Sequence, residues 1–427
     1  MSFMWKCLLN KTAKRFFYYV RESFHNKRII ISLMSSLLLI IISYFVNNFS
    51  LFTGESMLKY YSFQKVCNHI GLHSNINYGD AVFYNMSYDK KLIPAVDRYD
   101  TLGVDCVTDR EKLLKFLDLL HQTNKYKYVV VDIIFDNSVK SEVDKELFSK
   151  ISNMRNIVVA NHVHIDNAAK DLEKQGKTGL VTYFITSVAT NFGRMEYSID
   201  TIYNKKSLPL VVYENLHPEK KLKRFGIGKL SVYTMGNRIC QNSVFLTFDS
   251  TYVTPIKYEH NNYFFSSNYY TNVGKLLKDY EDSYEELKEM ISKNTEGKYV
   301  VIGDFSADVH DTYVGQLPGS IIMMRGIASL EDGLNIVRFS QILMWFVVFF
   351  LISLTILNNK PISRCLPIIK SVPYKLFHFS FSLVTFGFTL LVTSFIEYIL
   401  GFQVYSLVIP ILYFSLLKIV VQYKKTK

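Results

Sequence analysis

The sequence predicts an α/β extracytoplasmic domain with a mainly parallel or mixed sheet, attached to a membrane by four transmembrane helices. Two observations lead to this prediction. Four stretches of the 427-residue chain are almost free of charge, and each is close to the ~20 residues that a helix needs to cross a bilayer. A polar block lies between the first and second stretches, and in it apolar strands alternate with amphipathic helices, an order typical of parallel-sheet domains.

The first uncharged stretch, residues 29–46, predicts an N-terminal transmembrane helix. A cleaved signal peptide is the alternative, but its apolar region spans only about 7–15 residues before small residues at the cleavage site. Here the apolar run is longer and leads into Asn47-Asn48-Phe49. We therefore expect a retained anchor.

Three further stretches that are almost free of charge close the chain, at residues 339–357, 376–395 and 402–421, where Lys418 is the one charged side chain. Each predicts a transmembrane helix by length and composition. Only a short turn around Glu397 and Gly401 separates the last two, so these are expected to form a helical hairpin.

The basic residues predict the orientation in the membrane. Residues 1–28, the loop 358–375 and the tail 422–427 together hold fourteen Lys and Arg against Glu22 alone, a surplus of +13. The block 47–338 carries about −1, so these segments account for the net charge of +12 of the whole chain. Loops rich in Lys and Arg stay in the cytoplasm. Both termini are therefore predicted to be cytoplasmic, and the block 47–338 extracytoplasmic, in a multi-pass protein of the inner (cytoplasmic) membrane. Since the basic residues lie outside the folded block, they do not indicate a nucleic-acid partner.

Periodicity predicts the elements of the block 47–338. Unbroken apolar runs are typical of strands buried on both faces of a sheet, and one-sided apolar patterns are typical of helices. In chain order we expect a strand at 80–87, a helix opened by the capping-box pattern from Thr108, a strand at 128–135, a helix capped by Ser141, and strands at 157–160 and 208–213. Irregular structure or short antiparallel pieces are expected at 252–272, followed by a helix over 284–291, a strand at 299–303 and a helix at 320–330.

Polar side chains gather where three of these strands end. The carboxyl ends of parallel strands form the usual ligand-binding edge of such sheets. The candidate ligand-binding residues there are Asp132, Asp136, Asp304, Asp308 and Asp311, with His310 between the last two. A carboxylate inside an apolar strand needs a partner, and Arg110 is the candidate partner for Asp132.

The segment His162-Val163-His164-Ile165-Asp166 resembles the start of a metallo-hydrolase zinc site. Residues two apart in an extended segment point the same way, so His162 and His164 could share a metal with Asp166. That pattern continues with a further His, whereas this chain has Asn167. A polar strand end is therefore the favoured interpretation, and no cofactor is predicted.

Catalytic and disulfide signals are weak. The chain has no nucleophile elbow and no phosphate-binding glycine loop, motifs that would indicate hydrolase or nucleotide chemistry, so a protein that is not an enzyme is expected. Cys67, Cys106 and Cys240 fall in the predicted outer block with irregular spacing. Both a single disulfide and buried thiols remain open for them.

Several segments together resemble a known sensory family. They are Thr108-Asp109-Arg110, Tyr128–Asp136, Asp144–Leu147 and Gly297–Asp304. With the arrangement of one apolar stretch, a large outer block and three closing stretches, they resemble the second type of CHASE domain, an extracytoplasmic sensory module found with cyclases and histidine kinases. The resemblance covers about residues 50–357 and the closing hairpin.

The family pattern has D-x-x-F after a buried strand and D-x-x-L in the next helix, here Asp132 with Phe135 and Asp144 with Leu147. Later it has Ile-Gly, a loop aspartate and Pro-Gly, here Ile302-Gly303, Asp311 and Pro318-Gly319. Relatives often carry Asn-Ala in the following helix, whereas this chain reads Met-Arg-Gly-Ile-Ala at 324–328, which leaves a ligand contact there open.

The resemblance implies a membrane-anchored sensory or ligand-binding protein of the bacterial envelope, acting in signal transduction on an unknown small ligand. The inner segments are too short to fold as a catalytic output domain, so a protein partner is expected to carry the signal, and a homodimer is left open. Two alternatives are kept: a membrane-tethered metal-dependent hydrolase, and a structural subunit of an envelope complex.

Overall fold

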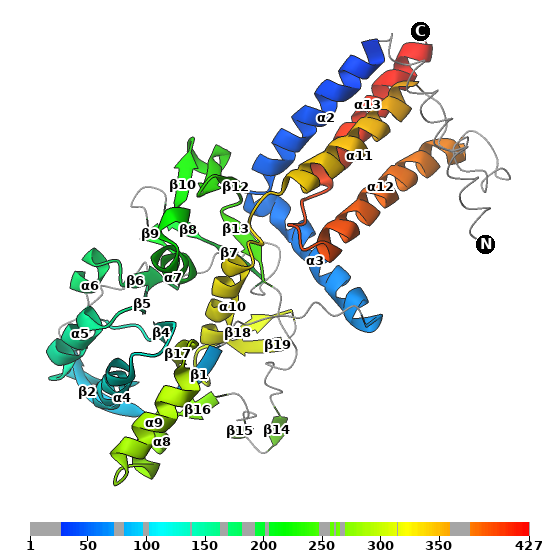
Figure 1. Ribbon diagram of the computed structural model, residues 1–427. Coiled ribbons are helices and arrows are strands. Elements are labelled where there is room, and N and C mark those ends of the chain that lie inside the picture. Colours follow the sequence, from blue (N-terminus) through cyan, green and yellow to red (C-terminus); the bar gives the residue numbers. More distant parts are fainter. Residues whose placement is uncertain are drawn as a thin grey trace, which may run out of the picture. The chain divides into compact units, whose positions relative to one another are not determined.

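The computed structural model describes residues 27–71, 81–96, 102–136, 139–162, 170–181, 193–200, 205–246, 257–259, 262–264, 270–313, 315–358 and 376–426. The chain divides into two compact units. One is an α/β unit, Tyr60–Ile336, and the other is a helical unit formed by the chain up to Lys59 and from Val337 onward. Figure 1 labels the elements of both.

A parallel sheet of six strands organises the α/β unit, which confirms the α/β part of the predicted fold class and its mainly parallel sheet. Every neighbouring pair in this sheet is parallel. All residues of the two central strands are buried except Asp132 at the end of β4, which is partly buried, as the unbroken apolar runs in the sequence predict. In spatial order the strands are β16 (Tyr270–Asn272), β1 (Ala81–Asn85), β17 (Tyr299–Gly303), β4 (Tyr128–Asp132), β5 (Ile157–Asn161) and β6 (Thr178–Leu180).

Helices cover both faces of this sheet (Figure 1). Alternate residues of β4 enter two separate apolar cores: Val129 and Val131 pack on one face, and Tyr128 and Val130 on the other. The first core contains α4 (Arg110–Thr123), α5 (Asp144–Asn153), α6 (Lys170–Lys174), α8 (Val273–Asp279) and α9 (Tyr284–Thr295), and the second contains α7 (Leu208–Leu216) and α10 (Gly319–Glu331).

Short antiparallel pieces complete the α/β unit. Two hairpins flank the carboxyl edge of the sheet, β2 (Lys90–Val96) with β3 (Leu102–Thr108) and β18 (Val309–Thr312) with β19 (Gly315–Pro318). A three-stranded sheet contains β10 (Leu222–Phe225), β11 (Val232–Met235) and β12 (Arg238–Cys240). Three further strand pairs are β7 (Arg194–Glu196) with β13 (Ser243–Phe245), β8 (Ser198–Asp200) with β9 (Lys205–Lys206), and β14 (Lys257–Glu259) with β15 (Asn262–Phe264). The unit also contains the short 3-10 helices η1 (Pro218–Lys220) and η2 (Gly228–Leu230).

Three local predictions are wrong. The segment 208–213 is helical, not extended, because the Ser207 side chain accepts a hydrogen bond from the Leu210 amide and Pro209 lies in the first turn, where its fixed φ suits a helix. This helix is buried nearly all round, so it shows no one-sided pattern. Helix α4 is capped by Asp109 instead of Thr108. The N-cap of α5 is Val143 without a side-chain bond, not Ser141.

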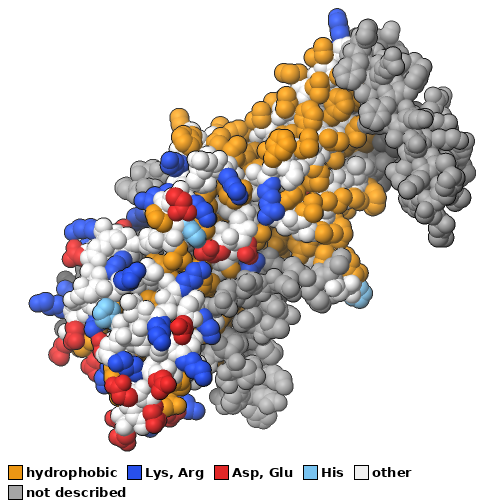
Figure 2. Space-filling view, in the orientation of Figure 1, with side chains coloured by type: hydrophobic (Ala, Val, Ile, Leu, Met, Phe, Trp, Pro, Cys, Tyr) orange, Lys and Arg blue, Asp and Glu red, His pale blue; other side chains and the backbone are white. Residues whose placement is uncertain are grey.

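The helical unit contains α2 (Lys27–Val46), α11 (Phe339–Asn358), α12 (Leu376–Ile399), α13 (Val408–Thr426) and the start of α3 (Ser50–His69). Helices α2 and α11 lie side by side and antiparallel (Figure 1), and at their shared end Arg28 Nη1 donates to Asn358 Oδ1 at 3.2 Å. Apolar side chains dominate the visible surface of these helices, whereas charged groups are spread over the α/β unit (Figure 2).

Four membrane spans are not supported. In the described residues, two helices, α2 and α11, are long and apolar enough to cross a membrane. The third and fourth predicted spans form α12 and α13, but their apolar segments there are shorter, Thr385–Ile399 and Val408–Tyr423. The predicted fourth span also loses its first turn and a half, because residues 402–407 are not helical. The segments 1–28 and 358–375, which the sequence predicts to be cytoplasmic, lie outside the described residues except for Lys27, Arg28 and Asn358.

A buried carboxylate ties together the helical unit. Glu397 of α12 is fully buried, and its Oε1 accepts hydrogen bonds from Gln341 Nε2 at 2.7 Å and from Trp345 Nε1, both on α11. Gln341 Nε2 also reaches the Gln403 carbonyl at 2.8 Å. Because a buried polar group is costly without partners, these contacts fix α11 against the segment that follows α12.

Candidate functional site

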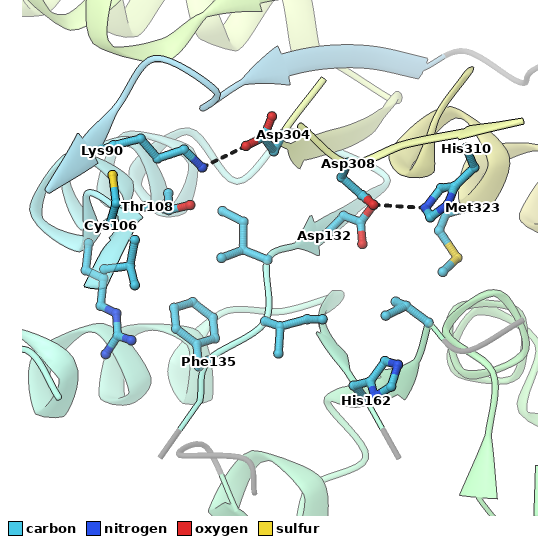
Figure 3. Close-up of a pocket in the computed structure, with 15 residues that line it drawn as sticks. Lys90, Cys106, Thr108, Asp132, Phe135, His162, Asp304, Asp308, His310 and Met323 are labelled. Atoms are coloured by element: carbon cyan, nitrogen blue, oxygen red, sulfur yellow. Dashed lines mark hydrogen bonds and ion pairs between the residues drawn. The ribbon is translucent and has the colours of Figure 1, made fainter. Parts of the chain in front are cut away.

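A cavity of about 610 Å³ opens at the carboxyl edge of the parallel sheet. Its volume lies in the range of small-molecule sites, about 300–1,000 Å³. Figure 3 shows side chains from several elements pointing into it. It is lined by Lys90, Cys106, Val107, Thr108, Arg110, Asp132, Ile133, Ile134, Phe135, His162, Val181, Asp304, Asp308, His310 and Met323.

Strand topology explains why these residues meet. Strand β4 ends at Asp132, β17 is followed directly by Asp304, and β5 by His162. Since these neighbouring strands run parallel, their carboxyl ends lie at one edge. The segment that leaves β4, residues 133–135, adds an apolar wall, to which Val181 and Met323 also contribute.

Asp304 is a structural carboxylate held fully ionised. Its Oδ2 lies 2.7 Å from Lys90 Nζ, and its Oδ1 accepts hydrogen bonds from Ser87 Oγ at 2.7 Å and from the amides of Ser306 and Ala307 at 3.0 and 2.8 Å. Burial alone would raise the pKa of Asp304, but these bonds outweigh it and lower the pKa to about 2. Asp304 thereby fixes its own loop and the start of β2.

Asp132 has the opposite electrostatic environment. Its Oδ2 accepts one hydrogen bond, from Ser320 Oγ of α10 at 2.8 Å. Burial, followed by the nearby charge of Asp308, raises the pKa of Asp132 to about 7, although Ser320 and His310 act against this rise. Asp132 can therefore take up or release a proton near neutral pH.

Asp308 and His310 form an ion pair beside Asp132 (Figure 3), with His310 Nε2 2.9 Å from Asp308 Oδ1. Burial alone would lower the pKa of His310, but the hydrogen bond and charge of Asp308, with smaller contributions from Asp132 and Asp311, outweigh it and raise the pKa. The charge of Asp308 therefore acts on the pKa of both Asp132 and His310.

Two glycines allow α10 to approach these acids. A Cβ at Gly303 would lie 2.0 Å from Ser320 Oγ and 3.4 Å from Asp132 Cβ, and one at Gly319 would lie 2.2 Å from Asp308 Oδ2. Contacts below 3.0 Å essentially never occur for real Cβ atoms. The absence of side chains at both positions is therefore what brings Ser320 and Asp308 into place.

Arg110 is not the partner of Asp132, contrary to the sequence prediction. Its guanidinium pairs with Asp144 and donates to the Val139 carbonyl at 3.0 Å, while lying over the Phe135 ring. The sequence could not reveal this, because Asp144 comes from the helix that follows. Arg110 still lines the cavity, but its charge is neutralised elsewhere.

The remaining predicted site residues divide into three groups. Asp132, Asp304, Asp308 and His162 line the cavity together, as their place at strand ends predicts. Two do not line it: Asp136, and Asp311, whose Oδ1 accepts from Gln316 Nε2 at 3.1 Å in the β18–β19 hairpin. His164 and Asp166 lie outside the described residues.

Sequence reasoning missed two polar groups of the site, Lys90 and Ser320. Lys90 follows the predicted strand 80–87, so the strand-end rule applied to that strand would have found it. Ser320 opens the predicted helix 320–330, and no sequence signal pairs it with Asp132.

Metal and disulfide chemistry have no support in the part of the chain that the structure describes. No group of three or more His, Cys, Asp or Glu side chains there is placed to hold a metal ion. Cys67 and Cys240 are buried thiols and Cys106 is an exposed thiol, none of them in a disulfide.

No protein-family model, curated protein or solved structure matches this chain. The resemblance to CHASE domains therefore stays a prediction from the sequence.

Proposed function

We propose that this protein is a membrane-anchored sensor whose α/β unit binds a small ligand in the cavity at the carboxyl edge of its sheet. The observation that carries the proposal is the cavity itself: a ligand-sized space with an apolar wall and a cluster of charged side chains, Asp132, Asp308 and His310. Polar groups that converge on a cavity with an apolar wall are typical of ligand sites.

The attachment to the membrane is proposed through α2 and α11. These helices are antiparallel, so the chain between them leaves and re-enters at the same end of the pair. Large apolar side chains on α2 are widely exposed, among them Ile30 at 64% and Met34 at 63%, which suits a lipid environment. Because Lys- and Arg-rich flanks stay in the cytoplasm, we propose that the α/β unit lies outside it.

A route from the cavity to the membrane helix exists along the chain. Helix α10 contributes Ser320 and Met323 to the site, and only residues 332–338 separate its end from the start of α11. We propose that a ligand favouring one position of α10 biases α11, and that a partner protein reads this change. Such a ligand must bind two states with different affinity.

Ligand binding is tested on the full chain in detergent by thermal unfolding against a panel of amino acids, amines, sugars, nucleosides and short-chain carboxylates. Ile134 is 38% exposed in the cavity wall, so Ile134→Trp should fill the space and abolish every stabilisation that the wild type shows. The matched control is Ile227→Trp, at a site 89% exposed and outside the lining. Stabilisation that survives Ile134→Trp would refute the cavity as the site.

The orientation is tested with the native Cys106. Its thiol is exposed, whereas Cys67 and Cys240 are buried. A membrane-impermeant maleimide should label intact spheroplasts that express the protein, and Cys106→Ser should remove this labelling. Labelling of Cys106 only after permeabilisation would place the α/β unit in the cytoplasm.

A further inference from the structure

The charges that line the cavity are unevenly distributed. In the described chain, two Lys or Arg side chains line the cavity, and each forms an ion pair with an acid other than Asp132 and Asp308. Lys90 pairs with Asp304 at 2.7 Å, and Arg110 pairs with Asp144. On the other side of the cavity, Asp132 and Asp308 lie close enough for their charges to interact. The cationic partner that the structure records there is His310, which pairs with Asp308. When both carboxylates are ionised, this side carries more negative than positive charge.

Protonation of one carboxylate reduces this excess of negative charge. Burial and, after it, the nearby charge of Asp308 disfavour the ionised form of Asp132 and raise its pKa to about 7, so Asp132 is the carboxylate that takes up the proton. A cation from outside would serve the same purpose, because it would stabilise both carboxylates and displace the proton.

The rest of the cavity is suited to an apolar body. Ile133, Ile134, Phe135, Val181 and Met323 form its wall, and Ile134 stays 38% exposed. Covering such surface on binding is favourable. With a volume of about 610 Å³, the space exceeds what an inorganic cation would fill.

We propose that the cavity binds a small organic amine, whose ammonium group is held by Asp132 and Asp308 and whose apolar body lies against the wall of residues 133–135, Val181 and Met323. This assignment rests on the proposed ligand-binding function and names its ligand class.

The proposal fixes the sign of the pH dependence. Amine binding requires ionised Asp132, so the affinity should rise as the pH increases through about 7 and fall toward tenfold per pH unit well below it. Loss of the proton from His310 at higher pH removes a competing cation and acts in the same direction. The titratable and charged groups facing this site from the surrounding elements are Asp308, His310, Asp304, Lys90, Arg110, His162 and Cys106.

Three probes of one shape separate the classes: cyclohexylmethylamine as cation, cyclohexanecarboxylate as anion and cyclohexylmethanol as neutral compound. Calorimetry of the full chain in detergent, at pH 7 in phosphate and in Tris, measures both affinity and protons exchanged, because these buffers differ in ionisation enthalpy. We expect the amine to bind at least tenfold more tightly than the alcohol and to release about half a proton per site, since a group with a pKa near 7 is half protonated at pH 7.

Asp132→Asn keeps the shape and an oxygen acceptor for Ser320 but removes the charge. It should weaken amine binding at least tenfold and abolish proton release, while leaving alcohol binding unchanged. Asp311→Asn, an equal charge change outside the cavity lining, should alter neither. His162→Gln should leave the proton release in place, because the release is assigned to Asp132.

Each other result overturns the proposal. Tighter binding of the carboxylate with proton uptake would show a site for anions, and equal binding of all three probes would show that only the apolar body is recognised. If none binds while a compound of the metabolite panel still stabilises the wild type but not Ile134→Trp, the amine assignment fails and the ligand-binding function stands. If the panel fails as well, both fail.

Discussion

Replacing Asp132 by asparagine should stabilise the α/β unit, and the gain should grow with pH. The pKa of Asp132 is about 7 in the folded protein, against 3.8 for an ordinary aspartate. A carboxyl whose pKa is raised by folding is protonated in both states at low pH, so its ionisation costs nothing there. The cost appears as the pH rises above about 4, grows up to about 7, and then stays constant.

The magnitude follows from the separation of the two pKa values. Each pH unit corresponds to about 1.4 kcal/mol, so the full separation would correspond to ~4 kcal/mol at pH 8. Asp132 is partly exposed to the cavity, and solvent there reduces the cost to about half. We therefore expect Asp132→Asn to gain ~2 kcal/mol at pH 8 and almost nothing at pH 4, because the asparagine retains an acceptor for Ser320.

The assay is thermal unfolding of the full chain in detergent, followed by circular dichroism at pH 4, 6 and 8. For a unit of this size, ~2 kcal/mol corresponds to a rise in Tm of about 4–8 °C. Asp311→Asn is the matched control and should show no such pH-dependent gain. If the rise in Tm of Asp132→Asn over the wild type is the same at all three pH values, or if its Tm is lower at pH 8, the reasoning that ionised Asp132 destabilises the fold is refuted.

Two further predictions concern the other carboxylates. Asp304→Asn should lower the free energy of unfolding by about 1–3 kcal/mol at pH 7, because it breaks the ion pair with Lys90 and weakens the loop. Its folded pKa is about 2, so the difference from wild type in urea unfolding should shrink as the pH falls from 4 toward 2; a constant difference would contradict this. In the helical unit, Glu397→Ala should cost about 2–4 kcal/mol. The buried Trp345 Nε1 would lose its acceptor, and Gln341 Nε2 would keep only the Gln403 carbonyl. Glu397→Gln, which retains an acceptor oxygen, should lose less than half of that in detergent-based thermal unfolding, and equal losses would count against the hydrogen-bond explanation.

How much of the fold could be predicted depended on how one-sided or unbroken each apolar pattern is. The runs at 128–132 and 299–303 are buried on both faces, and this burial is written into the sequence as continuous apolar residues. The segment 208–213 has equally continuous apolar character but lies in a helix buried nearly all round. Periodicity cannot separate these two cases; Ser207 and Pro209 could have done so.

The sequence predicts where in the fold the site residues lie, but it does not predict which side chains pair with one another. Because parallel strands end at a common edge, their order in the sequence already indicates that Asp132, Asp304 and His162 should be near one another. Which partner each one takes depends on helices packed from elsewhere in the chain, as Ser320 on Asp132 and Asp144 on Arg110 illustrate. Such pairings leave no trace in local spacing.

Asp304 and Asp132 end adjacent strands, yet their environments separate their pKa values to about 2 and about 7. The difference arises from the number of donors. Asp304 has a lysine, a hydroxyl and two amides, whereas the structure records one hydroxyl donor on Asp132, with Asp308 nearby. A carboxylate surrounded by donors stabilises the fold, and few of its acceptor positions remain open to a ligand. A carboxylate that lacks donors destabilises the fold while it is ionised and no cation is bound to it. The same lack of donors that should make the Asp132→Asn variant more stable would therefore make Asp132 bind a cation.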